Sequence, residues 1–292
     1  MPEVASEKTR RFALWNGLND RENAEAQRLR ELGIYGGAQG IWVDKARTAG
    51  GEIEPDGATA AILHTGRHYP DDLSDEAVIY HYPKTARPAG RDRAEVQKTK
   101  NAMEHKLPLF VILPGKSSQA KRSVKLGWVC DFDDDSRQFL ILFDANEPVY
   151  TGPEKPESEF QLTQEPARRT ATVKVRAGQQ RFRFNVMSQY GEKCAVCHIT
   201  HAQLLTAAHI CGKSDKGSDD WRNGIPLCAN HHGAFDAHLF GIEPGTAEVR
   251  CSAKTTLDAI GVSEHVLKPL KNFPHADALS WRWTATQKAW EG

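Results

Sequence analysis

The sequence lacks three features at once: a long hydrophobic run, an apolar signal core and a net charge. No stretch approaches the roughly 18 uninterrupted apolar residues that span a bilayer, so we expect no membrane association. The N-terminus, MPEVASEKTRRFALWNG, has no apolar segment of the kind that directs secretion, and this predicts a cytoplasmic protein. Only six cysteines are present, and in that compartment they are expected to be metal ligands or buried thiols rather than disulfides.

A formal net charge of zero looks awkward for a nucleic-acid-binding protein, but the charges are unevenly distributed. Eleven Lys and Arg and only three acids lie within residues 84–125. Six more cations and no acid lie within 168–183, whereas nine acids gather within 131–159. A charge run is usually a solvated face. Beside a nuclease motif, the two basic blocks become candidate phosphate contacts.

The chain is long enough for two domains, and 39% hydrophobic with 26% charged residues is typical of a folded globular protein. A helix is expected over Asn19–Leu32, and RFRFNVMSQY (181–190) predicts another. Short β-like runs separated by turn residues predict a compact curved sheet or barrel with few helices, and these runs are 58–66, 77–82, 107–113, 125–132 and 138–143. Pro- and Glu-rich text between 147 and 170 is typical of a linker. We therefore expect an N-terminal domain at 1–150, a linker at 151–175 and a C-terminal domain at 176–292.

Two short knuckles in the C-terminal half have the spacing of metal ligands. They are Cys194-Ala-Val-Cys197 and Cys228-Ala-Asn-His231. Together they supply three thiolates and one imidazole, a set that closes a tetrahedral structural zinc site. The alternative is that these cysteines are only small core residues. The other three cysteines stand outside the pattern and are expected to be ordinary thiols; they are Cys130, Cys211 and Cys251.

Around these knuckles the sequence LLTAAHICGKSDKGSDDWRNGIPLCANHHGAFDAHLF resembles the HNH nuclease family over about 179–240. The resemblance implies an α+β domain of the ββα-metal type, in which a β-hairpin and a helix surround one catalytic metal ion. It assigns His209 as the general base that activates water, a role that suits an imidazole near neutral pH. Asn223 pins the loop that orients this base, and His232 binds the catalytic divalent ion. The alternatives are a structural histidine and an asparagine that caps a turn.

Asp236 is the candidate for a second ligand of the catalytic ion. It follows His232 by four residues, so a helix presents both side chains on one face. One imidazole and one carboxylate, completed by water and phosphate oxygens, suit Mg²⁺ or Mn²⁺. Many family members carry Asp directly before the first His, where this chain has Ala208, and the acidic role must then move elsewhere. The alternative is that Asp236 caps the helix or pairs with a base.

The N-terminal half resembles the SRA domain over about 33–143, on the segments GIYGGAQGIW, ILHTGRHYPDDLSDEAVIYHY, EVQKTKNAMEHKLPLFVI, GWVCDF and FLILF. This resemblance implies an SRA/PUA-like curved β-barrel that flips a modified cytosine out of duplex DNA. The base pocket would hold aromatic rings that stack on the base and a carboxylate that accepts from its amine; the candidates are Tyr69, Asp71, Asp72, Tyr80 and Tyr82. The alternative is a solvated Asp-Asp turn beside half-buried tyrosines. His81 stands where a small polar residue is usual.

Cations that follow the pocket strand are expected to contact the DNA backbone, namely Lys84, Arg87, Arg91, Arg93 and Lys98. Combined, the two resemblances imply a modification-dependent restriction endonuclease of a prokaryotic cell, with structural Zn²⁺ and catalytic Mg²⁺ or Mn²⁺. Its partner would be double-stranded DNA containing 5-methylcytosine or 5-hydroxymethylcytosine. Cutting both strands with one centre per chain suggests a homodimer. Two alternatives remain: a reader of the EVE or ASCH type for another modified base, and a DNA-binding module that does not cleave.

Overall fold

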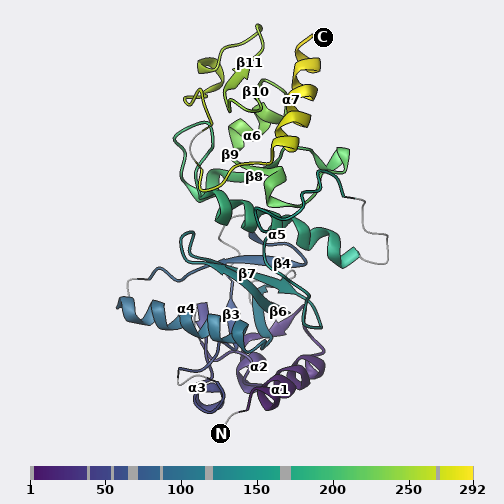
Figure 1. Ribbon diagram of the computed structural model, residues 1–292. Coiled ribbons are helices and arrows are strands. Elements are labelled where there is room, and N and C mark those ends of the chain that lie inside the picture. Colours follow the sequence, from purple (N-terminus) through teal and green to yellow (C-terminus); the bar gives the residue numbers. More distant parts are fainter. Residues whose placement is uncertain are drawn as a thin grey trace. The chain divides into compact units, whose positions relative to one another are not determined.

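The computed structural model describes residues 3–37, 40–53, 56–64, 72–85, 88–115, 121–164, 172–267 and 270–291. The chain forms two compact units, Met1–Gly152 and Pro153–Gly292 (Figure 1). No helix within the described ranges is both long and apolar enough to cross a membrane. Three of the predicted site residues lie outside these ranges, and they are Tyr69, Asp71 and Arg87.

The N-terminal unit is built on a seven-stranded sheet in the order β2-β3-β5-β6-β7-β4, with β1 added beside β6 (Figure 1). The strands β3 and β5 are parallel, and every other pair is antiparallel. The strands are β1 (Ala24–Glu25), β2 (Gly40–Trp42), β3 (Ala61–Leu63), β4 (Ala77–His81), β5 (Leu109–Pro114), β6 (Lys121–Asp133) and β7 (Gln138–Phe143). Over the described residues β2 and β4 are the two ends of the sheet and do not pair with each other. The sheet is therefore a curled half-barrel and not the barrel that the sequence suggested.

Both faces of this sheet are covered, because successive side chains of a strand point to opposite faces. Leu109 and Val111 of β5 belong to one hydrophobic cluster with Tyr80 and Ile141, and residues of helix α4 (Ala89–Glu104) pack against it. Phe110 belongs to the cluster on the other face, together with residues of α1 (Val4–Gly17) and α2 (Ala26–Glu31). A short helix, α3 (Lys45–Thr48), follows β2.

The helices of this unit differ from the sequence expectation. The predicted helix Asn19–Leu32 is helical only over Ala26–Glu31, because Ala24 and Glu25 pair with β6 instead. The helix α1 was not predicted, since its buried side is polar. Arg11 is fully buried there, paired with Glu7 at 2.7 Å, and it donates to the backbone oxygens of Thr59 and Pro108. A buried side held by an ion pair within the helix and by bonds to distant backbone carbonyls leaves no hydrophobic period in the sequence.

The C-terminal unit is organised around the hairpin of β8 (Leu205–His209) and β9 (Gly224–Cys228), followed directly by α6 (Ala229–Asp236). The helix α5 (Thr172–Tyr190) packs on this hairpin, and the glycine at 224 permits the approach, since a Cβ there would lie 2.5 Å from Val186. The remaining elements are η3 (Ala202–Leu204), η4 (Lys213–Asp215), η5 (Trp221–Asn223), β10 (Phe240–Ile242), β11 (Val249–Cys251), η6 (Asp258–Ile260) and α7 (Ala276–Glu291).

The C-terminal helix α7 supports α6. Arg282 donates to the backbone oxygen of Phe235 at the end of α6, and its guanidinium lies over the Phe235 ring. The indole N–H of Trp290 donates to the backbone oxygen of His238 at 2.6 Å. The tryptophan pair Trp283 and Trp290 makes an edge-on contact. These residues therefore pack within the C-terminal unit.

Part of the segment expected to be a linker belongs structurally to the C-terminal unit. The buried guanidinium of Arg222 donates to the backbone oxygens of Pro156 and Ser158 at 3.1 and 2.6 Å. Trp221 donates to the backbone oxygen of Glu154 at 2.7 Å, and Thr163 forms a β-bridge with Gly217. The composition of this segment is that of a linker, but its carbonyl groups satisfy buried donors of the domain that follows.

Candidate active site and metal centre

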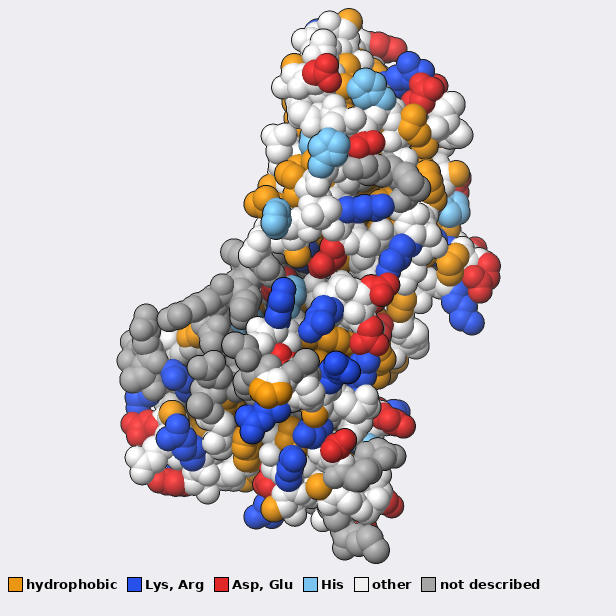
Figure 2. Space-filling view, turned by 90° about the vertical axis from the view of Figure 1, so that its left-hand side faces the viewer, with side chains coloured by type: hydrophobic (Ala, Val, Ile, Leu, Met, Phe, Trp, Pro, Cys, Tyr) orange, Lys and Arg blue, Asp and Glu red, His pale blue; other side chains and the backbone are white. Residues whose placement is uncertain are grey.

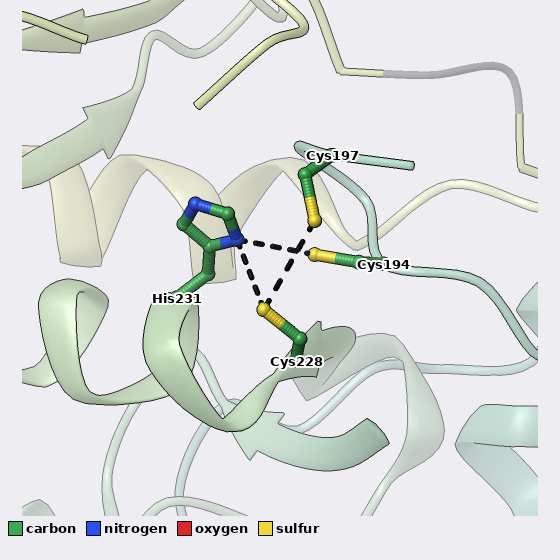
Figure 3. Close-up of side chains that lie close together, drawn as sticks. All are labelled: Cys194, Cys197, Cys228 and His231. Atoms are coloured by element: carbon green, nitrogen blue, oxygen red, sulfur yellow. Dashed lines mark hydrogen bonds between the residues drawn. The ribbon is translucent and has the colours of Figure 1, made fainter. Parts of the chain in front are cut away.

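The two knuckles converge on one point of the C-terminal unit (Figure 3). The ligand atoms of Cys194, Cys197, Cys228 and His231 all lie within 4.8 Å of one another, and all four residues are buried. His231 Nδ1 lies 3.1 Å from the sulfur of Cys228 and 3.5 Å from that of Cys194. Cys197 and Cys228 come from different knuckles, and their sulfurs are 4.0 Å apart.

The chemistry of this buried group fits a structural zinc ion. Burial raises the pKa of the Cys194 thiol to about 12 and lowers the pKa of His231 below its ordinary value. Thiolates are therefore costly here without a cation, and three soft sulfurs with one neutral imidazole are a set that zinc prefers. Four protein ligands would complete a tetrahedral shell. Such a closed site has a structural role, because it leaves no position for a substrate.

His209 ends strand β8 and is held on two sides. Its ring stacks on Phe182 of α5 with a centroid distance of 3.7 Å and an interplanar angle of 8°. Its Nε2 lies 3.0 Å from Oδ1 of Asp219, and Lys213 Nζ lies 2.7 Å from the same oxygen. Burial by itself raises the pKa of Asp219, but its bonds to His209 and Lys213 outweigh that effect, so the pKa lies below its ordinary value.

Asn223 is fully buried and closes the loop between the hairpin strands. Its side-chain oxygen accepts from the backbone N–H of Cys211 at 2.9 Å. Its amide donates to the backbone oxygens of Cys211 and Ser218 at 3.1 and 2.9 Å. Within this loop a Cβ at Gly217 would lie 1.8 Å from the Cys211 oxygen, so the loop can close only around a glycine. The Asn223 side chain thus bonds three backbone groups of the loop that follows His209.

His232 and Asp236 lie on one face of α6, as their spacing predicted, with His232 Nε2 3.4 Å from Asp236 Oδ2. The hydroxyl of Thr206 on β8 lies 3.3 Å from the Leu227 backbone oxygen, to which it donates, and 2.8 Å from His232 Nδ1. With its proton directed to that carbonyl, the Thr206 oxygen accepts from Nδ1–H. The lone pair of His232 Nε2 is thereby directed towards Asp236.

This imidazole–carboxylate pair fits a divalent catalytic ion better than a structural one. The side chain of Asp236 is 62% exposed, and that of His232 is 32% exposed. A nitrogen and a hard oxygen donor on an open face leave positions for water and for phosphate oxygens. Among the described residues, the C-terminal unit therefore has one closed group that could hold a metal ion and one open imidazole–carboxylate pair. Ala208 shares the Thr206 face of β8 by strand alternation, and its methyl group supplies no ligand.

The structure places the described candidates for the base pocket as follows. Tyr80 and Tyr82 are both buried in the same hydrophobic cluster of the sheet. Tyr82 donates to Asp134 at 3.0 Å, and its ring centroid is 4.6 Å from that of Phe139. Asp72 is fully buried and lies 2.9 Å from His81 Nε2. His81 points away from the tyrosine face by strand alternation, so the carboxylate and the tyrosines are held from different sides of β4.

The described cations of the predicted DNA-backbone set differ in exposure. Lys84, Arg91 and Arg93 are exposed, the two arginines in the first turns of α4. Lys98 is only 7% exposed, because it lies on the side of α4 that faces the unit, and it is therefore unsuited to contact phosphate in this conformation. Figure 2 shows Lys and Arg side chains gathered on the displayed face of the N-terminal unit.

Sequence reasoning missed three residues of the candidate active site. Asp219 contacts His209, Thr206 contacts His232, and Phe182 covers the His209 ring. Asp219 stands in SDDWRNG, where an Asp pair looks like a solvated turn, and Thr206 and Phe182 look like ordinary strand and helix residues. Only the closure of the hairpin and its packing on α5 bring them to the site.

Residues 194–243 match the HNH endonuclease family. No curated protein matches the chain significantly. Among solved structures, the chain is similar to the modification-dependent TagI restriction endonuclease, with 20% identity and a TM-score of 0.33 over 90% of this chain and 91% of that one. It is also similar to the type IV phosphorothioation-dependent restriction endonuclease ScoMcrA, with 14% identity and a TM-score of 0.24 over 79% of this chain and 64% of that one. The family match begins at the first knuckle and includes His209, Asn223, His232 and Asp236. The chain thus carries an HNH endonuclease domain, which supports activity as a DNA nuclease.

Proposed function

We propose that the protein is a modification-dependent DNA endonuclease. Its C-terminal unit would hydrolyse phosphodiester bonds, and its N-terminal unit would flip and read 5-methylcytosine or 5-hydroxymethylcytosine. The observation that carries the nuclease part is the β8–β9–α6 unit inside the HNH match. It holds His209 at the end of the hairpin and an open imidazole–carboxylate pair on the helix.

In the proposed reaction His209 takes a proton from the attacking water. The water oxygen forms a bond to phosphorus, the bond from phosphorus to the 3′ oxygen breaks, and the leaving oxygen receives a proton from solvent. His232 and Asp236 would hold the divalent ion, which when bound stabilises charge on the phosphate and on the leaving oxygen. Asn223 contributes by keeping the loop after His209 closed. The Cys194, Cys197, Cys228 and His231 group would hold zinc for structure.

The reader part is supported by chemistry and burial in the N-terminal unit. Tyr80 contributes an aromatic ring from one face of the sheet, and a flipped base would stack on this ring. Asp72 is a buried carboxylate next to the strand end, and a carboxylate accepts from the exocyclic amine of cytosine. Tyr69, Asp71 and Tyr82 complete the proposed pocket. The exposed Lys84, Arg91 and Arg93 would contact the backbone on either side, together with Arg87.

The test is digestion of matched duplexes that carry cytosine, 5-methylcytosine, 5-hydroxymethylcytosine or N6-methyladenine, with Mg²⁺, with Mn²⁺ and with a chelator. We expect cleavage only of the two modified-cytosine duplexes, and none with the chelator. Equal cleavage of every duplex would overturn the reader and keep the nuclease. Cleavage that depends on N6-methyladenine would favour a reader of the EVE or ASCH type. Binding to DNA without any cleavage would favour a DNA-binding module that does not cleave.

We also propose that two chains act together on a duplex, since one nuclease centre per chain cuts one strand. Sedimentation of the protein with an uncleavable modified duplex should show two chains per duplex. Double-strand cutting by a species that stays monomeric at all concentrations would overturn this proposal.

A further inference from the structure

The carboxylate of Asp219 is fixed between three elements of the C-terminal unit. Its Oδ1 lies 3.0 Å from His209 Nε2 at the end of β8 and 2.7 Å from Lys213 Nζ in η4. Its other oxygen lies against α5, since a Cβ at Gly178 would be 2.8 Å from Oδ2. The side chains of Asp219 and His209 are each only 14% exposed.

This arrangement determines which nitrogen of His209 can act as a base. An ionised carboxylate only accepts hydrogen bonds, so His209 Nε2 must be the donor to Asp219. In the neutral ring the lone pair is then on Nδ1. The stacked Phe182 ring, with a centroid distance of 3.7 Å, fixes the plane of the imidazole, and the bond to Asp219 fixes which edge of the ring faces the carboxylate. The contact therefore selects both the tautomer and the orientation of the ring.

Asp219 is poorly placed for the other role open to a carboxylate, that of a metal ligand in place of the Asp missing at position 208. Its Oδ1 already accepts hydrogen bonds from His209 Nε2 and Lys213 Nζ. Its Oδ2 lies against α5 at Gly178, which leaves little room for a metal ion. The open ligand set lies on α6 at His232 and Asp236. Lys213 also donates to the Gly217 backbone oxygen at 2.9 Å, which ties the carboxylate to the loop that Asn223 closes.

We propose that Asp219 is the positioning residue of the general base in this nuclease. It holds His209 with Nδ1 directed to accept the proton of the attacking water, and its charge stabilises the imidazolium that then forms. Lys213 shares the same oxygen and keeps the carboxylate in place when His209 is neutral. This inference rests on the proposed function, because it assigns a partner to the base of that reaction.

The experiment is a double-mutant cycle of Asp219→Ala and His209→Ala in the full chain, with metal-dependent cleavage of the preferred duplex as the readout. Asp219→Ala should lower kcat by up to roughly the 10²–10⁴-fold that a general base contributes. KM and the metal concentration for half-maximal rate should not change, since the proposal gives Asp219 a contact to His209 and none to DNA or metal. In the His209→Ala background the same substitution should have no further effect, because residues that act as one unit are not additive.

Two further variants keep the test decisive. Asp219→Asn retains an oxygen that can accept from both partners, so it should fold like the wild type and still lose kcat through the missing charge. Asp215→Ala removes an exposed carboxylate from the same loop and should cleave at the wild-type rate. Thermal unfolding of each variant confirms that the unit is folded.

Three results would overturn the inference. The first is wild-type kcat in both Asp219 variants, and the second is an equal loss of kcat on Asp219→Ala in the presence and absence of His209. The third is a higher metal concentration for half-maximal rate, which would identify Asp219 as a metal ligand. Each requires that the wild type cleaves. A wild-type protein that cleaves no duplex under any metal condition would instead overturn the proposed function itself.

Discussion

In the C-terminal unit the two candidate catalytic histidines are held by polar side chains from elsewhere in that unit, whereas in the N-terminal unit the candidate stacking residue Tyr80 lies within a hydrophobic cluster of the sheet. His209 and His232 each have a polar partner within 3.0 Å that comes from another element, Asp219 and Thr206. Tyr80 is 8% exposed and belongs to the hydrophobic cluster on one face of the sheet. A catalytic group needs a defined tautomer, and a stacking platform needs a rigid face.

This difference predicts that the two units can be impaired separately. Changes at the polar partners should alter the rate of cleavage and spare binding. Changes on the tyrosine face should alter the discrimination of modified from unmodified DNA and spare the chemistry. The predictions below test this separation.

The largest effect is expected from the closed cysteine–histidine group. Cys197→Ser, or removal of metal with a strong chelator, should unfold the C-terminal unit and abolish cleavage. Zinc binding contributes about 10–16 kcal/mol in zinc-finger peptides, as much as the whole net stability of a domain. Calorimetry should show loss of one unfolding transition while that of the N-terminal unit remains. Cys251→Ser, outside the group, serves as the control, and a Cys197→Ser protein that cleaves normally would disprove the structural role.

His209→Ala should come next. Loss of the general base is expected to lower kcat by roughly 10²–10⁴-fold, with the unit still folded. Binding to modified duplex, measured by fluorescence anisotropy, should be unchanged, because reading of the modified base is proposed for the other unit. A variant that nicks DNA at the parent rate would show that His209 is not the base.

Tyr80→Leu tests the other side of the comparison. Loss of one stacked base is expected to weaken binding of the modified duplex by about 1–3 kcal/mol, or roughly 5–150-fold, and to leave unmodified DNA unaffected. Tyr80→Phe keeps the aromatic face and should bind like the wild type. Equal weakening on both duplexes would mean that Tyr80 is only a core residue.

A smaller loss is expected from Thr206→Val, which keeps the shape of the side chain and removes the acceptor for His232 Nδ1–H. Loss of a group that orients a metal ligand typically costs about 10–100-fold in metal affinity or activity. We expect the Thr206→Val variant to need a higher Mg²⁺ or Mn²⁺ concentration for half-maximal cleavage. Thr206→Ser retains the hydroxyl and should restore the wild-type requirement. An unchanged metal titration for Thr206→Val would contradict the assignment of His232.

The polar helices of the N-terminal unit show where pattern reasoning fails. Hydrophobic periodicity indicated the strands that became β3 to β7. It could not indicate α1, whose buried Arg11 bonds Glu7 and two carbonyls that lie 48 and 97 residues away in the sequence. The expectation that Lys98 is exposed failed for the same reason. A cation within a basic run looks solvated in the sequence, and only the packing of α4 on the sheet buries it.

What the sequence determined by itself are the relations set by short spacing. Two residues between the ligands of each knuckle bring them to one point, and a separation of four positions puts His232 and Asp236 on one helix face, because local backbone geometry allows little else. The tertiary structure alone decided which groups meet across elements, such as Asp219 with His209 and Arg222 with the segment before α5. Those contacts depend on the path of a closed loop and on the packing of α5, and no residue spacing records either.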